Sequence, residues 1–467
     1  MPTKTLDEYL KQTTHTTTKQ QATKPKYRII GFYKETEFQE TPIGKIPKQW
    51  NISRLEHLAT AIYYGVTAKA VEHNTGLKML RTTDIKDYKV DWDSLPYCEI
   101  TSKVNDIKKY LLRKGDLIVA RAGTVGVSVL VDRNFDNIVF GSYLIKVRPK
   151  ENLVYPKFLH YYFQNKRYWK HIRKAQGSTL KNINLGILKF LLVPIPPLEE
   201  QWGIAEVLSA LDRAIEATGR LIGRLERLKR GLMQELLTRG IGHKEFKETP
   251  IGKIPKEWRI VKLSEVSKID TKPVMPRPGV KYYYLGLEDI ESETGRILKP
   301  GNMLTDGSEI KSIKYVFTSR HILYGRLRPY LNKVALPDRD GICSTDLLPV
   351  LPEENLVLRE YLAYVLRGER FVKYASDRMK GTNHPRISQK DILMYIFSLP
   401  PIDEQKVIVK ILNSIDEWIM FEIKRKEKFE RLKRGLMELL LTGRVRVRVE
   451  RINEAEDSSG SSGVAGR

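Results

Sequence analysis

The sequence predicts an α+β protein with two similar globular mixed α/β domains, joined by two long antiparallel helices that form an intramolecular coiled coil. Three observations predict this fold. The second half of the chain repeats segments of the first, each half holds short β-branched segments between turns, and each half ends in a long apolar heptad pattern. The two halves are expected to be related by a pseudo-two-fold axis.

The repeat is the strongest of these observations. Residues 38–50 read FQETPIGKIPKQW and residues 246–258 read FKETPIGKIPKEW, so eleven of thirteen positions match at an offset of 208. IPPLEEQ at 195–201 answers LPPIDEQ at 399–405, and ERLKRGLM occurs at 226–233 and again at 430–437. A period this long indicates a duplicated domain with an appended helix rather than a solenoid.

The segments between these shared frames differ. Residues 61–90 and 269–292 have little in common beyond Asp-Ile, at Asp84-Ile85 and Asp289-Ile290. Gradual drift of two copies would spread the differences evenly, whereas here nearly identical segments flank a dissimilar middle. The duplicated frame therefore carries two different fillings.

Each filling is expected to be a small sheet with helical cover. Residues 116–120, 127–131 and 143–147 are short, β-branched and bounded by turns, as in strands. A helix is expected over 155–174, with its counterpart over 360–374.

Each Pro-Pro turn is followed by apolar residues that alternate spacings of four and three, which is typical of a coiled-coil seam. The predicted seam residues are Val207, Leu211, Leu221, Leu225, Leu228, Leu232, Ile411, Ile415, Trp418, Phe429, Leu432 and Leu436. A helix of about 33 residues spans roughly 50 Å, so the helices could act as a ruler between the domains. The same seam could also serve other subunits. Basic residues off the seam, such as Lys229 and Lys433, are expected to be solvated, with contact to a partner surface or to phosphate as the alternative.

The charge balance indicates a polyanionic partner. The chain of 467 residues has 81 Lys and Arg against 56 Asp and Glu, a formal charge of +25. Such an excess favours nucleic acid, although a solvated basic surface, common in proteins of hot environments, has the same composition. Cys98 and Cys343 make no disulfide framework, and no membrane or secretory segment stands out, so we expect a cytoplasmic protein.

No catalytic or metal site emerges from the sequence. Neither an Asp-Pro-Pro-Tyr type motif nor a G-x-G-x-x-G fingerprint or P-loop is present. Asp84-Ile85-Lys86 is a minimal nuclease-like group, but its counterpart Asp289-Ile290-Glu291 lacks the lysine. The aromatic run at 161–169 could stack on bases, yet its helical spacing favours a core face.

Candidate DNA contacts are basic and polar side chains at equivalent places of the two halves. They lie beside predicted strand ends or in the loops after Gly177-Ser178-Thr179 and Gly381-Thr382. These candidates are Arg81, Arg121, Lys181, Asn182, Arg326, Arg328, Asn383, His384 and Arg386. For each of them a solvated loop residue is the alternative.

The two-copy plan, the TPIGKIPKQW frame, the Gly-Ser-Thr and Gly-Thr segments and the PPLEEQ and PPIDEQ turns resemble the DNA-specificity subunit of type I restriction-modification systems. The resemblance covers residues 27–443. It implies two target recognition domains that each read one half of a bipartite, asymmetric site on double-stranded DNA, with a spacer set by the helices. It also implies docking of methylation subunits, expected to number two, and of restriction subunits. No cofactor is expected in this chain, because S-adenosylmethionine, ATP and magnesium would belong to those partners.

The expected division is an N-terminal tail (1–24), target recognition domain 1 (25–204), a central helix (205–240), target recognition domain 2 (241–408), a second helix (409–443) and a tail (444–467) that is disordered at its end. We expect a non-catalytic subunit of a complex that methylates adenine and cuts DNA with ATP. Two rivals remain at this point: a single-chain restriction-methylation enzyme, and a coiled-coil scaffold or RNA-binding protein.

Overall fold

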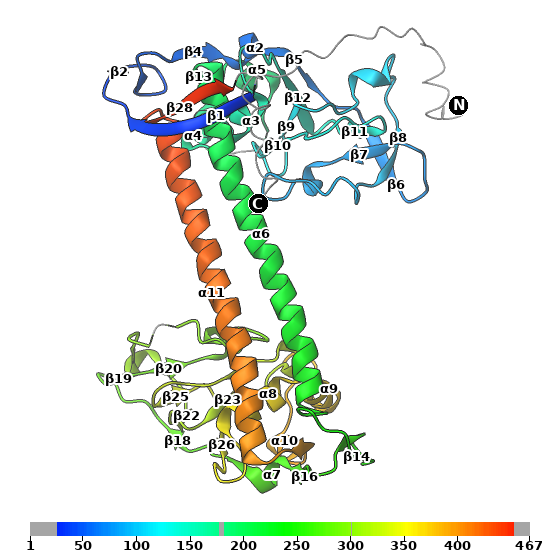
Figure 1. Cartoon of the computed structure of the whole chain (residues 1–467), viewed down its shortest axis with the longest axis vertical. Helices are drawn as coiled ribbons and strands as arrows, with labels where there is room; N and C mark the ends of the chain where they lie inside the picture. Colours follow the sequence, from blue (N-terminus) through cyan, green and yellow to red (C-terminus); the bar gives the residue numbers. More distant parts are fainter. Residues whose placement is uncertain (1–25, 177–181, 300, 453–467) are drawn as a thin grey trace, which may run out of the picture. The chain divides into compact units, whose positions relative to one another are not determined.

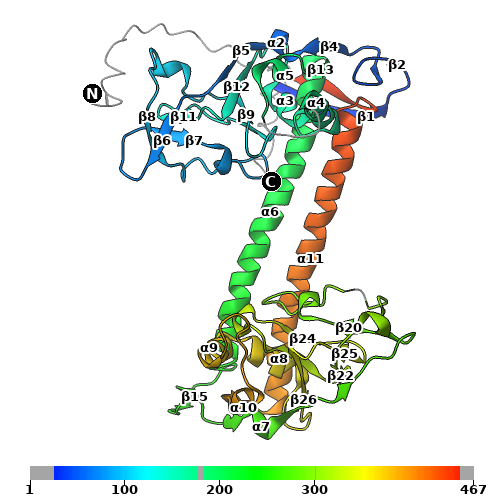
Figure 2. The same cartoon turned by 180° about the vertical axis from the view of Figure 1, so that it is seen from behind.

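The computed structural model describes residues 26–176, 182–299 and 301–452, and the chain forms two compact units (Figure 1, Figure 2). Unit 1 combines the chain up to Ala217 with the chain from Lys426 onward, and unit 2 runs from Thr218 to Arg425. Each unit holds one mixed α/β domain, one part of the helix α6 (Leu198–Leu236) and one part of the helix α11 (Ile402–Leu440). The predicted fold class is therefore confirmed.

Besides its parts of α6 and α11, unit 1 contains fourteen strands and four short α-helices within the described residues. Its strands are β1 (Lys26–Lys34), β2 (Phe38–Gln39), β3 (Ile46–Pro47), β4 (Asn51–Arg54), β5 (Ala59–Tyr64), β6 (Ala68–Val71), β7 (Lys78–Leu80), β8 (Tyr97–Ile100), β9 (Leu117–Ala120), β10 (Ser128–Leu130), β11 (Ile138–Phe140), β12 (Leu144–Pro149), β13 (Leu192–Ile195) and β28 (Val445–Ile452). Its short helices are α2 (Leu55–Leu58), α3 (Pro156–Tyr162), α4 (Lys166–Gln176) and α5 (Leu185–Lys189).

Unit 2 also contains fourteen strands and four short α-helices within the described residues. Its strands are β14 (Phe246–Lys247), β15 (Ile254–Pro255), β16 (Arg259–Lys262), β17 (Ser267–Ile269), β18 (Pro273–Val274), β19 (Lys281–Tyr282), β20 (Tyr284–Leu285), β21 (Thr305–Asp306), β22 (Lys314–Phe317), β23 (Ile322–Gly325), β24 (Val334–Ala335), β25 (Gly341–Cys343), β26 (Leu347–Pro352) and β27 (Ile396–Leu399). Its short helices are α7 (Leu263–Val266), α8 (Arg359–Arg367), α9 (Glu369–Arg378) and α10 (Gln389–Leu393).

One sheet is common to both units and another differs. The order β10-β9-β12-β5 in unit 1 is repeated as β24-β23-β26-β17 in unit 2. The second sheet has the order β11-β7-β8-β6 in unit 1 but β18-β22-β25-β20 in unit 2. Both second sheets contain one parallel pair of strands, β7 with β11 in unit 1 and β20 with β25 in unit 2. The other two strands of the sheet lie beside β7 in unit 1, but beside β25 in unit 2. The dissimilar fillings of the sequence thus have different topologies on a shared sheet.

Several predicted bounds change. The expected helix over 155–174 is two helices, because Asn165 accepts a hydrogen bond from the backbone N–H of Arg167 (2.8 Å) and begins α4 anew. The long helices begin at Leu198 and Ile402 rather than at 205 and 409, directly after the Pro-Pro turns. Proline is compatible with the first turn of a helix, so the turn and the helix are continuous.

The beginning of α6 is held to the first domain by the shared frame residues. Trp50, fully buried, donates its indole N–H to Glu200 (3.1 Å). Gln201, also fully buried, accepts from the backbone N–H of Tyr155 (2.7 Å) and donates to the carbonyl of Leu153 (3.1 Å). These bonds satisfy polar groups that would otherwise be buried without partners.

Unit 2 repeats this arrangement at α11. Trp258 donates to Glu404 (2.8 Å), and Gln405 accepts from the N–H of Leu358 (2.8 Å) and donates to the carbonyl of Leu356 (3.0 Å). The repeated KIPK-x-W and PP-x-x-E-Q segments are therefore two halves of one buried joint between a domain and its long helix.

A second repeated contact joins each domain to both long helices. In unit 1 the hydroxyl of Tyr161 on α3 donates to Asp212 on α6 (2.6 Å). The same carboxylate pairs with Lys433 on α11 (2.6 Å), whose ammonium lies 5.5 Å from the centre of the Tyr161 ring. One carboxylate thus binds a domain and a neighbouring helix together.

In unit 2 the equivalent group is Tyr364, Asp416 and Lys229. Tyr364 donates to Asp416 (2.8 Å), and Lys229 pairs with Asp416 at 2.5 Å. Both lysines were expected to be solvated, but their side chains are only 12% and 19% exposed, so that expectation was wrong. Within each unit these pairs bring α6 and α11 together in antiparallel directions.

The predicted seam is only partly the face that the helices share. Leu221, Leu225, Leu232 and Ile415 lie in the apolar cluster between α6 and α11 of unit 2, together with Ile419. Val207 and Leu436 pack on the core of unit 1, and Ile411 packs on that of unit 2. Leu211 and Phe429 are partly buried.

Leu228, Trp418 and Leu432 were wrongly placed in the seam, since each is 50% exposed. The buried face of α11 is set by Ile408 and Leu412, which pack on the domain before the helices meet. Spacings of three and four residues from Leu412 lead to Ile415 and then to Ile419, which lie on this buried face. The predicted seam started at Ile411 and reached Trp418 instead, and these two residues lie on a neighbouring face of the helix.

The C-terminal segment is not a mere tail, because β28 pairs antiparallel with β1. Arg446 of β28 is 2% exposed and donates two hydrogen bonds to Glu200 (2.6 and 2.7 Å) and one to Glu35 (2.6 Å). These hydrogen bonds and the Coulomb attraction raise the pKa of Arg446 against the opposing effect of its burial, which is the largest single influence.

Among the described residues, no helix combines the length and apolarity needed to cross a membrane.

We expect Arg446→Met to destabilise the chain by about 3–5 kcal/mol, because the buried Glu200 carboxylate would lose its counter-charge. Chemical denaturation of the whole chain measures this change. The control is Arg448→Met on the same strand, where the side chain is exposed and a change within about 0.5 kcal/mol is expected. Equal effects of both substitutions would contradict the buried network.

Candidate nucleic-acid interface

In each domain the structure brings together two of the regions predicted to contact DNA. These are the arginine at the end of a strand and the loop before the short helix α5 or α10. The N–H of Arg121, just after β9, donates to the carbonyl of Tyr143, and its carbonyl accepts from Ile183 (both 2.9 Å). In unit 2 the N–H of Arg326, just after β23, donates to Asp346 (2.9 Å), and its carbonyl accepts from Ile387 (3.1 Å). Arg121 and Arg326 are therefore structurally equivalent.

The side chains of these two arginines are packed rather than extended. The Arg121 guanidinium lies over the ring of Tyr64, 4.5 Å from its centre, a cation–π contact. In both arginines the Nε atom is buried and has no hydrogen-bond partner within the described residues. A buried donor without a partner is costly, so these two arginines are held in place at an energetic cost.

The candidates in unit 2 form one cluster. Arg386 makes a bidentate pair with Asp346 (2.6 and 3.1 Å), and this hydrogen bonding raises the pKa of Arg386. Its Nη1 also donates to the carbonyl of His384 (3.2 Å). The N–H of Arg328 donates to Pro385 (2.8 Å), and its Nη2 donates to the carbonyl of Asn383 (3.4 Å). The loop at 380–387 and the β23–β24 loop thus form a single surface.

Unit 1 has a smaller set of described candidates. Arg81 makes a bidentate pair with Asp84 (3.0 and 2.7 Å), a bond that raises the pKa of Arg81. The neighbouring Thr82 lies beside Gly123 of the β9–β10 loop, so this pair adjoins the loop that follows Arg121. Asn182 is exposed, and Lys181 lies outside the described residues.

The loops that follow β9 and β23 share a backbone feature but not a sequence. Gly123 and Gly126 have φ of +71° and +88°, and the corresponding positions in unit 2 are Arg328 and Asn332, with φ of +50° and +49°. Glycine adopts this left-handed region freely and Asn tolerates it. For an arginine the same conformation costs about 1–2 kcal/mol.

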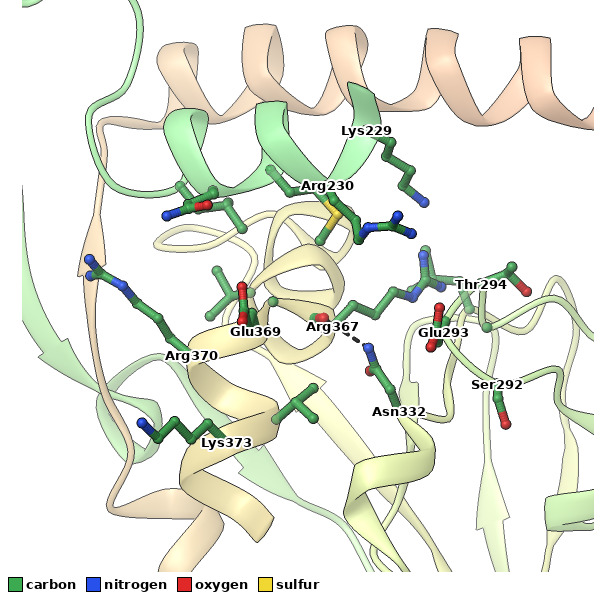
Figure 3. A pocket seen from close by; sticks show the side chains of 18 of the residues that line it. Lys229, Arg230, Ser292, Glu293, Thr294, Asn332, Arg367, Glu369, Arg370 and Lys373 are labelled. Carbon is green, nitrogen blue, oxygen red and sulfur yellow. Dashed lines mark hydrogen bonds between the residues drawn. The ribbon is translucent and has the colours of Figure 1, made fainter. Parts of the chain in front are cut away.

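The β23–β24 loop, which contains Arg328 and Asn332, is bonded to Arg367 at the end of α8. Asn332 donates to the carbonyl of Arg367 (3.0 Å), as Figure 3 shows, and the guanidinium of Arg367 donates to Val334 (3.0 and 2.8 Å). The cavity in that view has a volume of about 2380 Å³, and Arg370 and Lys373 of α9 are among its lining residues. Sequence reasoning missed Asn332 and the α9 residues. The Arg328-Pro329 dipeptide gave no signal for the left-handed backbone of Arg328, because proline favours an extended conformation in the residue before it.

The Asp-Ile pair of the minimal nuclease-like group has the same local geometry in both units. Asp84 and Asp289 each accept a hydrogen bond from the backbone N–H three residues earlier, of Arg81 (2.8 Å) and Gly286 (2.7 Å). In both units the shared Asp is the last residue of a 3₁₀ turn (82–84 and 287–289) and its side chain closes that turn, so it has a structural role. Over the ranges that the structure describes, no group of three or more His, Cys, Asp or Glu side chains is arranged to hold a metal ion.

The aromatic run at 161–169 belongs mainly to the core, as its spacing predicted. Tyr162, Phe163 and Tyr168 are fully buried, and Tyr161 is 3% exposed. The hydroxyl of Tyr168 donates to the carbonyl of Gly126 (2.7 Å), so this helix supports the β9–β10 loop from inside.

Comparison with known proteins agrees with this architecture. The family model for the type I restriction modification DNA specificity domain matches residues 47–227 and 255–431, once in each half of the chain. The chain belongs to this family. It is a type I specificity subunit, and not one of the catalytic subunits.

Relatives and solved structures extend the match over nearly the whole chain. A Methanocaldococcus jannaschii protein that carries the name of a type I restriction enzyme MjaX specificity subunit is 31% identical over 90% of this chain and 99% of its own length. The Escherichia coli EcoDI specificity subunit is 23% identical over 80% and 82%. The specificity subunit from M. genitalium has a similar fold, with a TM-score of 0.52 at 16% identity over 86% of this chain and 98% of that one.

The bond between Asp346 and Arg386 should hold the 380–387 loop on the sheet. We expect Asp346→Ala to accelerate tryptic cleavage after Lys380 or Arg386, because the loop loses its bidentate contact to Asp346, the residue just before β26. Mass spectrometry of timed digests measures the rate. Asp338→Ala is the control, since Asp338 pairs with its sequence neighbour Arg339 in an exposed position. Equal acceleration there would contradict the anchoring role.

Proposed function

We propose that this specificity subunit recognises a bipartite, asymmetric site on double-stranded DNA, with one half-site read by each domain. The observation that carries the proposal is the shared four-stranded sheet, which supports differently ordered second sheets and different loop residues in the two units. A common sheet would dock both domains equivalently on a duplex, while unlike loops would meet unlike base edges. Sequence is read from base edges and shape, whereas phosphate contacts only position the protein.

The DNA-binding residues proposed are the polar and basic side chains of the two loop surfaces. In unit 1 they are Arg81, Arg121, Lys181 and Asn182, and in unit 2 they are Arg326, Arg328, Asn383, His384 and Arg386. The net charge of +25 supports binding to the phosphate backbone, so the affinity should fall steeply with salt. We place this binding in the cytoplasm.

The proposal includes docking of methylation subunits on the long helices and, through them, of restriction subunits. Trp418 and Phe421 of α11 are 50% and 62% exposed and lie three residues apart, so they share one face of the helix. Exposed apolar side chains of this size support a protein partner. S-adenosylmethionine, ATP and magnesium are assigned to those partners and not to this chain.

A binding experiment tests the bipartite function and the spacer together. The chain, co-expressed with its methylation subunits, is titrated with duplexes that carry the site mapped from methylated bases in cells, with the spacer varied one base pair at a time. We expect one preferred spacer, and insertion of seven residues into both α6 and α11 should lengthen it by about three base pairs. The reason is that seven residues add about 10 Å of helix and one base pair adds about 3.4 Å.

The control inserts seven residues into α6 alone, which mismatches the helices and should weaken binding without defining a longer spacer. Equal affinity of the wild-type complex for all duplexes would refute sequence-specific recognition. An unchanged spacer in the doubly extended variant would leave recognition intact but remove the role of the helices as a ruler.

Docking has its own test. The double substitution Trp418→Ala and Phe421→Ala should reduce co-purification of the methylation subunits at least 30-fold, since buried aromatic anchors at interfaces are commonly worth about 2 kcal/mol or more. Met303→Ala with Leu304→Ala is the control, because these side chains are similarly exposed (55% and 50%) but lie in a domain loop. Retained co-purification in the helix variant, or equal loss in the control, would move the interface elsewhere.

A further inference from the structure

The two equivalent loops place different side chains at the same backbone position. Arg328 is the second residue after Arg326, just as Gly123 is the second residue after Arg121. Both positions have a left-handed backbone, with φ of +50° and +71°. The first unit therefore fills this position with the residue that suits it, and the second fills it with a long cationic side chain.

The conformation of Arg328 is imposed by its surroundings. Its N–H donates to Pro385 (2.8 Å), Pro329 follows it and is buried, and Asn332 closes the loop on Arg367 (3.0 Å). Backbone strain that the surroundings hold in place is concentrated at functional sites in proteins. Glycine would adopt the same conformation without strain, so the position points to a role of the side chain.

Arg328 is also the most available arginine of its cluster. Arg386 is paired with Asp346, and Arg326 is packed with its Nε buried. Arg328 is exposed, and no carboxylate in the described part of the chain lies within 4.0 Å of its guanidinium. Within the described residues its guanidinium makes one hydrogen bond, to the carbonyl of Asn383, and at 3.4 Å this bond is long and leaves most of the guanidinium donors unused.

We propose that Arg328 reads a guanine in the half-site of the second domain, and that the first domain has no counterpart of this contact because Gly123 stands in its place. The planar guanidinium can donate two parallel hydrogen bonds to O6 and N7 of guanine, which is the commonest specific contact of arginine in the major groove. This assignment rests on the proposed function. It makes Arg328 a specificity-determining residue of one half-site only.

The test measures binding of the wild-type complex and of three variants to duplexes in which each base pair of the mapped site is replaced in turn. We expect Arg328→Gly to lose a roughly 10- to 100-fold preference at one G·C pair of one half-site, as is typical of one bidentate contact. Discrimination in the other half-site should be unchanged. The melting temperature should not fall, because glycine fits the left-handed backbone.

Arg328→Lys separates base reading from phosphate binding. It keeps the positive charge, and therefore the salt dependence, but should lose the same guanine preference because an ammonium has no bidentate geometry. Arg328→Asn is a second truncated variant whose residue tolerates this backbone. Arg259→Ala, which removes an exposed charge from β16 of the same unit, is the matched control and should preserve every preference.

Equal weakening on all duplexes would overturn the assignment in favour of a phosphate contact. Unchanged preferences in all three variants would overturn it as well, as would a loss spread over both half-sites. These outcomes differ from failure of the proposed function, in which the wild-type complex itself would show no preferred bipartite duplex.

Discussion

The buried joint at the start of each long helix is the contact on which the rest of the structure depends. In each unit a glutamate and a glutamine from the first turn of the long helix enter the domain core. The glutamate binds the frame tryptophan, and the glutamine binds the backbone just before α3 or α8. Removing any partner would leave buried polar groups without hydrogen bonds, which proteins rarely tolerate. The direction in which each helix leaves its domain follows from this joint, and this explains why KIPK-x-W and PP-x-x-E-Q are repeated nearly unchanged while their surroundings diverge.

A second constraint extends the joint to both helices. The groups Tyr161–Asp212–Lys433 and Tyr364–Asp416–Lys229 each use one carboxylate to bind a domain helix and a lysine of the opposite long helix. Because the aspartate is shared, rotation of either long helix would break a bond to the domain as well as one between the helices. Each unit thus contains the same rigid corner, whatever loops its domain presents.

Divergence is concentrated where this rigid frame leaves room for it. The shared sheet holds Arg121 and Arg326 in equivalent positions, whereas the loops after them carry Gly123 in one unit and Arg328 in the other. A left-handed backbone position that accepts either residue allows the surface chemistry to change without a change in the sheet. Under the proposed function, this arrangement would let the two domains differ in their sequence preferences on one scaffold.

The sequence by itself determined the duplication, the α+β class, the strands over 117–120, 128–130 and 144–149 and the buried aromatic run, because near-identical segments and alternating apolar residues leave few other folds. It also named residues of the two loop regions that the structure brings together in each unit. Only the tertiary structure decided which face of α11 packs on α6. Ile408 and Leu412 are buried in the core of the domain, and this orients α11 so that Ile419 contacts α6 and Trp418 is exposed. It likewise decided that Lys229 and Lys433 are paired, that β28 joins β1 and that Arg328 stands on a left-handed backbone. The physical reason is that all four depend on residues far apart in the chain, whose proximity no local pattern of spacing encodes.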